Sequence, residues 1–416
     1  MKKKTLTWLF GAVCICSVFT FCNKPPKPNP APLLISEKKE IPPVSVYNDP
    51  NPYTHQLLLE YNDFIERAIG NGLAPGAAVA IIKDSSVIFL KGFGLKDIKN
   101  KDSINTTTVF RIASVSKCFA AVLTGILVDN NILSLNDQVV QYLPEFKLRT
   151  VSQTNGLTLR HVLSHTIGLP RHSFTDRVDA GVNFDTLVYH LRDLPLLGKP
   201  GQYYSYQNVG FSLIGDVIQA ATGKSYAENL QSLVFDKLNM SSASVTYDSI
   251  MRNGNVAKPH HFKKGWRAAP ISSTYYNVGP AGGINASISD MARWLLALTQ
   301  EDGLLKPATK KELFTPVVKA VPRNNNFWKW KPVKSAHYAL GWRVINFKTD
   351  TLLYHGGFVN GYRSEVAINQ KERIAICVLV NSPGHLADIS IPKFFELYTS
   401  KEKDIKEWGV FSMASR

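Results

Sequence analysis

Apolar positions switch between helical and strand-like spacing along this chain. Between residues 53 and 70 they recur every three or four positions, which predicts an amphipathic helix. Two short apolar runs follow, at 77–82 and 87–93, and the polar residues between them predict a β-hairpin. Towards the other end, strand-like runs occur at 338–346, 351–355, 363–369 and 373–381, and a last helix is predicted at about 391–400.

The long region between these two groups of strands is mainly helical in pattern. Helices are predicted at 114–129, 156–164, 184–191, 208–221, 226–238 and 287–299. Strands from both ends can join one sheet, with the middle inserted between them. We therefore predict an α+β fold, in which an antiparallel β-sheet is flanked by N- and C-terminal helices and carries an inserted, mostly helical domain. This domain would cover 53–416, with its α/β part at about 53–113 and 335–400 and its helical part at about 114–334.

The first 22 residues have the features of an export signal. Lys2, Lys3 and Lys4 precede an apolar run over 5–21, which is short for a membrane span. Cys22 ends this run, as the lipidated cysteine does in bacterial lipoproteins, although Phe21 stands where a small residue is usual. The proline-rich stretch over 23–52 predicts an extended tether. We expect an exported protein, in the periplasm or on the outer surface, with lipidation of Cys22, ordinary cleavage and an uncleaved anchor as the alternatives.

The charge balance is strongly basic. The chain has 48 Lys and Arg against 32 Asp and Glu, a net charge of +16. Such an excess suits nucleic acid, anionic lipid or cell-wall polymer. Apart from the residues near each end, the basic side chains are scattered and do not alternate with aromatic ones. The footprint of a nucleic-acid-binding protein is therefore not expected.

The first candidate for chemistry is Ser114-Val115-Ser116-Lys117, at the start of a predicted apolar helix. Residues three apart share one face of a helix, so the serine hydroxyl and the lysine amine can touch. A desolvated lysine can lose its proton and activate the serine as a nucleophile. Three other Ser-x-x-Lys spacings occur, but only this one opens a long apolar helix after a polar turn.

Two further constellations carry polar groups suited to the same chemistry. Tyr206 and Asn208 are two residues apart at a predicted helix start, where a phenol can relay a proton and an amide can orient a base. His355 and Gly357 end a predicted strand, and glycine there permits a ligand to approach backbone N–H groups. Each residue also has a purely structural alternative, as a packed aromatic ring, a helix cap or part of a simple turn.

Together these motifs resemble the superfamily of class C β-lactamases, DD-peptidases and related esterases. The motifs are Ser-x-x-Lys, Tyr-x-Asn and His-x-Gly, in that order. Further stretches that resemble the family are Pro75-Gly76, 110–117, 163–170, 280–283 and 289–292. The resemblance covers about residues 57–400, nearly the whole predicted globular part.

The resemblance implies a penicillin-recognising type of serine hydrolase that needs no cofactor or metal. By matching positions, Ser114 would be acylated, and Lys117 and Tyr206 would share the general-base and general-acid work. Asn208 would orient Lys117 and the substrate. His355 and Gly357 would lie at the substrate site, and the backbone N–H groups of Ser114 and Phe358 would form the oxyanion hole.

His355 departs from the β-lactamase pattern, in which a lysine carries a permanent charge at this position. Histidine is mostly neutral at pH 7, which weakens the case for efficient β-lactam hydrolysis and favours the esterase and peptidase branches. Arg363 is a candidate substitute cation, with a surface ion pair as the alternative. The aromatic residues Tyr203, Tyr275, Tyr276, Trp328 and Trp330 could line an acyl pocket or simply pack.

Three alternative functions stay open beside an ester, amide or peptide hydrolase acting on a small molecule. These are a DD-carboxypeptidase or D-amino-acid peptidase acting on cell-wall peptides, a β-lactamase, and a non-catalytic penicillin-binding or sensor protein. His161 and His165 have the spacing of helical metal ligands, yet a structural hydrogen-bonding role is favoured. Cys118 and Cys377 do not resemble a disulfide framework. The sequence does not predict an oligomeric state.

Overall fold

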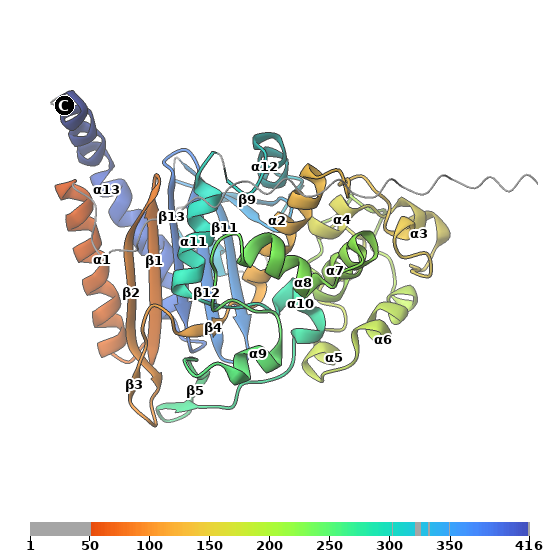
Figure 1. Cartoon of the computed structure of the whole chain (residues 1–416), viewed down its shortest axis with the longest axis horizontal. Coiled ribbons are helices and arrows are strands. Elements are labelled where there is room, and N and C mark those ends of the chain that lie inside the picture. The colour runs from red at the N-terminus through yellow and green to blue at the C-terminus, as the bar shows by residue number, and fades with distance from the viewer. Residues whose placement is uncertain (1–50, 302, 321–325, 332, 349, 415–416) are drawn as a thin grey trace, which may run out of the picture. The chain divides into compact units, whose positions relative to one another are not determined.

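Residues 51–301, 303–320, 326–331, 333–348 and 350–414 are described by the computed structural model (Figure 1). They lie within one unit that spans Glu37–Arg416. The predicted export signal, Cys22 and nearly all of the predicted tether fall outside the described residues. Pro52, the last residue of that tether, is the first residue of a helix. None of the described helices combines the length and the apolar character needed to cross a membrane.

Nine strands of the described chain form one antiparallel sheet, in the order β3-β2-β1-β13-β12-β11-β10-β9-β8. Two small pairs of strands, β4 with β7 and β5 with β6, lie outside it. The strands are β1 Gly76–Lys83, β2 Ser86–Asp97, β3 Asp102–Ser103, β4 Val109–Arg111, β5 His260–Phe262, β6 Trp266–Ala268, β7 Asn285–Ser287, β8 Val318–Lys319, β9 Val333–Tyr338, β10 Arg343–Phe347, β11 Asp350–Val359, β12 Tyr362–Asn369 and β13 Ile374–Val380.

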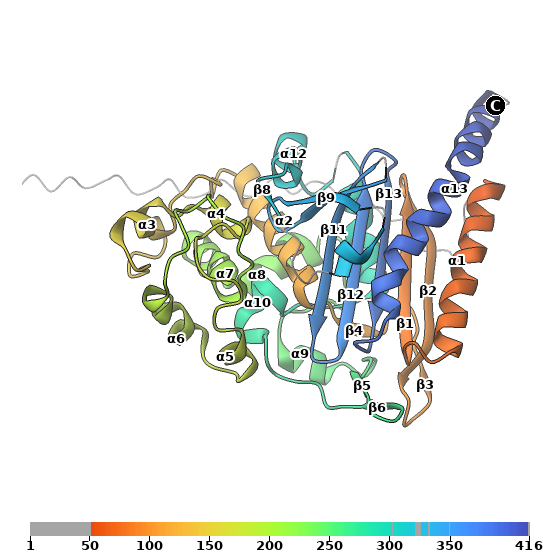
Figure 2. The ribbon, with the colours of Figure 1, turned by 180° about the vertical axis from the view of Figure 1, so that it is seen from behind.

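Helices cover both faces of this sheet, as Figure 2 shows from the opposite side. The long helices α1 and α13 pack together on one face, and α11 crosses the other, beside the mostly helical region. The α-helices are α1 Pro52–Gly70, α2 Ser116–Asp129, α3 Val151–Gly156, α4 Leu159–Leu163, α5 Thr175–Asp179, α6 Phe184–Tyr189, α7 Asn208–Thr222, α8 Tyr226–Leu230, α9 Tyr247–Arg252, α10 Gly279–Gly282, α11 Ile288–Thr299, α12 Pro307–Phe314 and α13 Leu386–Ala414.

The interior strand β1 explains why two layers of helices are needed. Its residues are almost all apolar and buried, so alternate side chains need cover on both faces of the sheet. Ala78, Ala80 and Ile82 pack into the core shared with the helical region. Val79 and Ile81 pack instead into the core under α1 and α13. The predicted α+β architecture is confirmed, with the first and last helices flanking an antiparallel sheet.

The strand predicted over 338–346 is in fact two strands joined by a tight turn. β9 ends at Tyr338 and β10 begins at Arg343, and the two pair as neighbours. Gly341 in the turn has φ +75°, a conformation that favours glycine. A Cβ at Gly341 would lie 2.6 Å from the carbonyl oxygen of Lys117. The apolar pattern continued through the turn because the turn is itself buried against α2.

Other elements also differ from the prediction. The helix predicted over 156–164 is not continuous, because α3 ends at Gly156 and α4 spans Leu159–Leu163. β11 does not end at residues 354–357 but continues to Val359, because Gly356 and Gly357 still pair with Glu365 and Ser364 of β12. The last helix is longer than 391–400 at both ends and contains Pro392. The added length at its start lies against the sheet, where burial of Leu386 and Ala387 stabilises it.

Candidate active site

Ser114 lies in a short 3-10 turn, Ala113–Val115, that leads directly into α2. The preceding residue, Ala113, has φ +49°, which is a strained conformation for a residue with a side chain. Ser114 is half-buried, whereas every other residue from Arg111 to Ala120 is buried. The turn therefore presents one hydroxyl from an otherwise enclosed segment.

Three hydrogen bonds, made with the segment before β7 and with β12, hold this turn in place. The backbone N–H of Ile112 donates to the carbonyl oxygen of Ile284 at 3.0 Å, and Ile284 N–H donates to Ser116 Oγ at 3.1 Å. Ser364 Oγ, on β12, donates to the carbonyl oxygen of Ile112 at 2.6 Å. The strain at Ala113 persists because these bonds fix the residues beside it.

Gly357 is the position where β11 touches the turn. A Cβ added there would lie 2.4 Å from Ser364 Oγ and 2.6 Å from the carbonyl oxygen of Ile112. Glycine is therefore required, because a side chain would push the Ser114 turn off the strand.

We expect Gly357→Ala to lower kcat for ester hydrolysis by roughly 10²-fold, because a displaced nucleophile loses its alignment. Gly356→Ala is the matched control, since its Cβ would crowd Tyr354 and Glu365 instead of the Ser114 turn. That control should lose stability but keep kcat per folded molecule. Equal kcat losses in the two variants, after correction for the folded fraction, would contradict the alignment argument.

Lys117 lies one turn further along, in α2, and its side chain is fully buried. Its Nζ is 2.8 Å from the carbonyl oxygen of Ala281, 2.9 Å from Asn208 Oδ1 and 3.4 Å from Ser114 Oγ. A neutral amine has two N–H donors, and these two acceptors satisfy both of them. Ser114 Oγ is the third polar neighbour of Nζ, so the lone pair of a neutral Lys117 would be available to the Ser114 hydroxyl.

The surroundings favour this neutral form of Lys117. Burial lowers the pKa of Lys117 well below its ordinary value, and the Arg343 guanidinium lowers it further. No carboxylate among the described residues forms an ion pair with Lys117. The geometry and the electrostatics are therefore those that a base acting on Ser114 would need.

Tyr206 and Asn208 come from the loop before α7 and from its first residue. The ring of His165 holds this segment, since its Nδ1 accepts from the backbone N–H of Gln207 at 3.2 Å. The carbonyl oxygen of His165 also accepts from Ser205 N–H at 2.8 Å. Burial raises the pKa of Tyr206, while Arg343 and a hydrogen bond with Ser114 act in the opposite direction. Ser114, Lys117, Tyr206 and Asn208 thus lie together.

Arg343, at the start of β10, is a buried cation that the sequence analysis missed. Its guanidinium is 5.5 Å from the centre of the Tyr206 ring, and Lys117 Nζ is 4.7 Å from the same ring. Tyr338 and Phe327 also face Arg343, each at 5.8 Å. No carboxylate of the described chain pairs with Arg343, and its Nε has no partner there. A signal was present, because an arginine in an apolar strand is rarely buried without a purpose.

His355 is fully buried and its ring nitrogens are both engaged. Its Nδ1 is 3.0 Å from the carbonyl oxygen of Gly356, so the proton sits on Nδ1, and Nε2 accepts from the Tyr338 hydroxyl at 3.1 Å. Burial, then Arg343 and Lys117, lower the pKa of His355 well below its ordinary value. His355 is therefore neutral, and Arg343 rather than His355 carries the permanent charge near Tyr206.

Phe358 follows Gly357 in β11, and its side chain is 59% exposed. β11 pairs with β10 only from Asp350 to Tyr354, so the stretch from His355 to Val359 has a strand neighbour on one side, β12. This leaves a free backbone edge beside the Ser114 turn, where the predicted oxyanion donors belong.

Arg363 is neither a substitute cation nor part of a surface ion pair. It is buried, and its Nη2 donates to Glu365 and to Asp388, each at 2.7 Å. Two carboxylates balance its charge, so it adds little net field at Ser114. Glu365 also accepts from the Tyr354 hydroxyl at 2.6 Å, and the pair stabilises the sheet beneath Gly356.

The aromatic residues proposed for an acyl pocket do not form one group. Trp330 packs in the core under α13, with its indole N–H donating to the Asp388 carbonyl at 2.9 Å. Tyr276 stacks on the buried Arg111 at 4.4 Å, and Tyr203 is 49% exposed. Tyr275 is half-buried, and its side chain packs against Gly282, next to the Ala281 carbonyl that accepts from Lys117. The side chain of Trp328 lies outside the described residues.

His161 and His165 do not share a helix, because α4 ends at Leu163. His161 Nδ1 caps that helix by accepting from Thr158 N–H at 3.2 Å, while His165 serves the Tyr206 segment. No cluster of metal-binding side chains occurs in the described parts of the chain. Cys118 and Cys377 are separate buried thiols.

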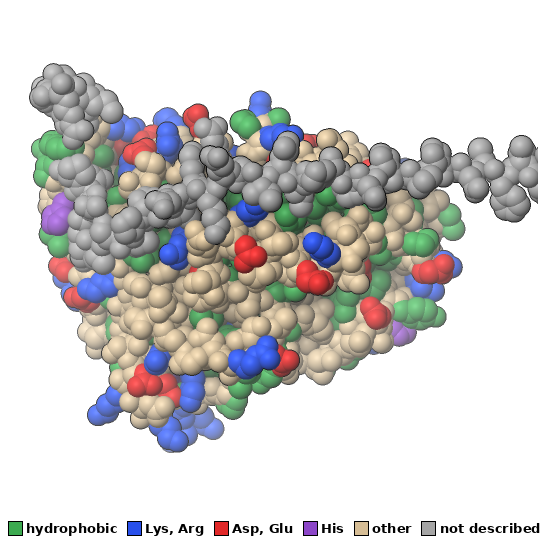
Figure 3. Space-filling view, viewed as in Figure 1, with side chains coloured by type: hydrophobic (Ala, Val, Ile, Leu, Met, Phe, Trp, Pro, Cys, Tyr) green, Lys and Arg blue, Asp and Glu red, His purple; other side chains and the backbone are tan. Residues whose placement is uncertain are grey.

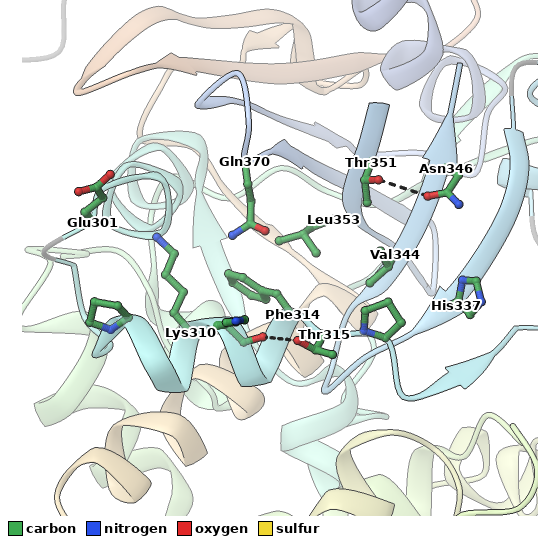
Figure 4. A pocket seen from close by; sticks show the side chains of 13 residues that line it. Glu301, Lys310, Phe314, Thr315, His337, Val344, Asn346, Thr351, Leu353 and Gln370 are labelled. Atoms are coloured by element: carbon green, nitrogen blue, oxygen red, sulfur yellow. Dashed lines mark hydrogen bonds between the residues drawn. The ribbon is translucent and has the colours of Figure 1, made fainter. Parts of the chain in front are cut away.

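A cavity of about 750 Å³ lies away from these residues, between α12 and strands β9 to β11 (Figure 4). Its floor is apolar, with Phe314, Val344 and Leu353, and its rim carries Lys310 and Gln370. None of the candidate catalytic residues lines it. This cavity is therefore separate from the Ser114 turn.

Comparison with known proteins identifies the family of the chain. The family model named Beta-lactamase matches residues 62–391. Protein flp of Staphylococcus aureus is 26% identical over 351 residues, a match that covers 82% of this chain and 66% of that protein. The unguisins hydrolase ungD' of Aspergillus campestris is 24% identical over 336 residues, covering 78% and 61%. The chain thus spans slightly less than two thirds of the length of these relatives.

A solved structure shares the fold. The octameric penicillin-binding protein homologue from Pyrococcus abyssi has a TM-score of 0.72 and 25% identity, covering 82% of this chain and 77% of that one. The family match spans most of the chain, including Ser114, Lys117, Tyr206, Asn208 and His355. The protein therefore belongs to the beta-lactamase family, within the serine hydrolase superfamily.

Proposed function

We propose that this protein is a serine hydrolase that cleaves esters, amides or peptides through an acyl-enzyme on Ser114. The observation that carries the proposal is the fully buried amine of Lys117, which lies within hydrogen-bonding distance of Ser114 Oγ, Asn208 Oδ1 and the carbonyl oxygen of Ala281. An inert binding protein has no use for such a costly buried lysine.

The proposed reaction has two acyl-transfer steps. Ser114 Oγ attacks the substrate carbonyl carbon while its proton passes to Lys117 Nζ. The bond to the leaving group then breaks, and the leaving group takes a proton from Lys117, with Tyr206 sharing the transfer. Water attacks the acyl-enzyme by the reverse sequence and frees Ser114. The backbone N–H groups of Ser114 and Phe358 would stabilise the oxyanion in both steps.

The experiment that tests this proposal offers three substrates to the chain without its first 22 residues. These are a chromogenic acetate ester, a peptide ending in D-alanyl-D-alanine, and a chromogenic β-lactam. Turnover of the ester is expected, because neutral His355 leaves the site without the lysine charge of β-lactamases. Peptide turnover with a stable penicillin adduct would favour the DD-peptidase or D-amino-acid peptidase. β-Lactam turnover would favour a β-lactamase. If none of the three substrates reacts, a non-catalytic sensor would be favoured.

Arg343 supplies the fixed positive charge of the proposed site. Its field disfavours protonation of Lys117, so removing it should raise the pKa of Lys117. The side chains that face Tyr206 and Arg343 are the imidazoles of His165, His172 and His355 and the phenols of Tyr204 and Tyr338. Burial lowers the pKa of His172 to about 4 and also lowers those of the other two histidines, so all three are neutral at pH 7.

We therefore expect Arg343→Met to move the acidic limb of the kcat/KM profile to higher pH, because a smaller fraction of Lys117 is then deprotonated at a given pH. Arg343→Lys should restore much of the original profile. The measurement is kcat/KM for a neutral ester across the pH range. An unchanged limb, with only a higher KM for substrates that carry a carboxylate, would assign Arg343 to substrate binding instead.

We also propose that the protein is exported and anchored through a lipid on Cys22. The support is the lysine-rich start, the short apolar run and the cysteine that ends it. The neighbour from Pyrococcus abyssi is octameric.

A further inference from the structure

The β5–β6 hairpin presents an aromatic side chain to solvent. Phe262 is 66% exposed at the end of β5, and its ring packs edge-to-face on Trp266, with the centroids 5.2 Å apart. The loop between them is Lys263-Lys264-Gly265, in which Lys264 and Gly265 have positive φ. Apart from this contact with Trp266, the Phe262 ring is open to solvent, next to two lysines.

Five exposed cations lie on this hairpin or on the turn beside it. Lys263, Lys264 and Arg267 lie on the hairpin, and Lys99 and Lys101 lie on the turn between β2 and β3. The two segments are neighbours, since Ile98 N–H donates to His260 Nε2 at 3.3 Å. Figure 3 shows the basic side chains gathered at the lower edge of the molecule, where Figure 1 places β3 and β5.

These five cations outnumber the acidic residues of the same two segments, of which only Asp102 is exposed. Within segments 97–103 and 260–268 the acidic residues are Asp97 and Asp102, and Asp97 is buried and paired with Lys258 at 2.9 Å. Among the described residues, none of the five cations forms an ion pair. The patch, defined here as Phe262 with these five cations, is therefore strongly positive around an apolar centre.

The hairpin is held firmly by its base. Trp266 Nε1 donates to the Gly72 carbonyl at 2.8 Å, and His260 N–H donates to the Asn381 carbonyl at 2.9 Å. Trp266 thus anchors the hairpin to the rest of the protein, while Phe262 stays largely exposed to solvent. A rigid hairpin presents its side chains without a large ordering cost on binding.

We propose that this patch docks the protein on an anionic lipid surface. Phe262 would enter the headgroup region, and the lysines and Arg267 would face the lipid phosphates. Lipid fits better than nucleic acid, because single-stranded binding needs successive stacking rings along a groove and Phe262 is a single exposed ring at a convex tip. The inference rests on neither the hydrolase chemistry nor lipidation of Cys22.

The test measures co-sedimentation of residues 23–416 with vesicles of phosphatidylcholine alone, or mixed equally with phosphatidylglycerol. Each lysine near an anionic surface contributes about fivefold to partitioning. The Lys263→Glu, Lys264→Glu double variant should therefore bind the mixed vesicles at least ~25-fold more weakly. Phe262→Ser should weaken binding by about fivefold or more, since one buried aromatic ring is lost. Higher salt should weaken wild-type binding.

The matched control is Lys371→Glu with Lys403→Glu, which makes the same change of net charge at side chains 77% and 85% exposed elsewhere on the molecule. It should bind nearly as well as the wild type. Equal losses in the two double variants would reduce the effect to net charge and overturn the proposal. So would wild-type binding to phosphatidylcholine alone with equal strength, or tighter binding to single-stranded DNA than to the mixed vesicles.

Circular dichroism and ester hydrolysis check that the hairpin variants are folded. Both should be unchanged, because the hairpin shares no contact with Lys117 or Tyr206 in the described structure. If the wild type binds vesicles but hydrolyses nothing, docking stands and the proposed hydrolase function fails. If it hydrolyses esters but does not bind anionic vesicles, the hydrolase function stands and the docking proposal fails.

Discussion

Ser114→Ala should abolish ester hydrolysis, with a loss of about 10⁴-fold or more in kcat. The hydroxyl is the group that forms the covalent bond, and no other exposed hydroxyl lies within reach of Lys117 Nζ in the described structure. The protein should remain folded, because Ser114 is half-buried and the substitution removes only its hydrogen bonds with Lys117 and Tyr206. Steady-state turnover of the chromogenic ester measures the loss, and mass spectrometry measures the acyl adduct.

Ser116→Ala provides the matched control, two residues along the same turn. Ser116 is fully buried and its Oγ accepts from Ile284 N–H, so it stabilises the turn without reaching substrate. This variant should lose some stability yet still form the adduct. An adduct on Ser114→Ala, or its absence only in Ser116→Ala, would show that the nucleophile has been wrongly assigned.

Lys117→Arg should lose roughly 10³- to 10⁴-fold in kcat, close to the loss expected for one essential acid–base group. An arginine keeps the positive charge but cannot give up its proton in a protein. The variant therefore separates a base from a fixed cation. If Lys117 acted through charge alone, Arg would preserve much of the rate.

Lys117→Met completes this test, because methionine fills similar volume without any charge. It should be as inactive as Lys117→Arg but at least as stable as the wild type, since the cost of burying an amine is removed. Thermal unfolding gives the stability, and single-turnover acylation gives the rate. A methionine variant that was inactive only because it unfolded would leave Lys117→Arg to decide the assignment.

Local pattern was enough to predict the elements that depend on their own residues. The amphipathic segment 53–70 forms α1, and the unbroken apolar run at 77–82 forms most of the interior strand β1. The order of helix, hairpin, helical middle and late strands implied one sheet built from both ends. Pattern could not locate the turn at Gly341 or the continuation of β11 to Val359. Both depend on backbone neighbours that are distant in sequence.

The candidate site divides in the same way. Ser114 and Lys117 share one helical turn, so their spacing alone brings hydroxyl and amine together. Asn208 and the Ala281 carbonyl reach Lys117 from positions 91 and 164 residues away in the chain. Their contacts arise only when α7 and α10 pack beside α2.

The sequence by itself determined the family motifs, the α+β class and the identity of the candidate nucleophile and base. The tertiary structure alone decided the charge state of the site. Burial lowers the pKa of Lys117, and the packing of the strands places Arg343 beside Tyr206 without a carboxylate and gives Arg363 two carboxylates. The physical reason is that a side chain's pKa depends on which groups surround it and how much water they exclude, and neither is written in its local sequence.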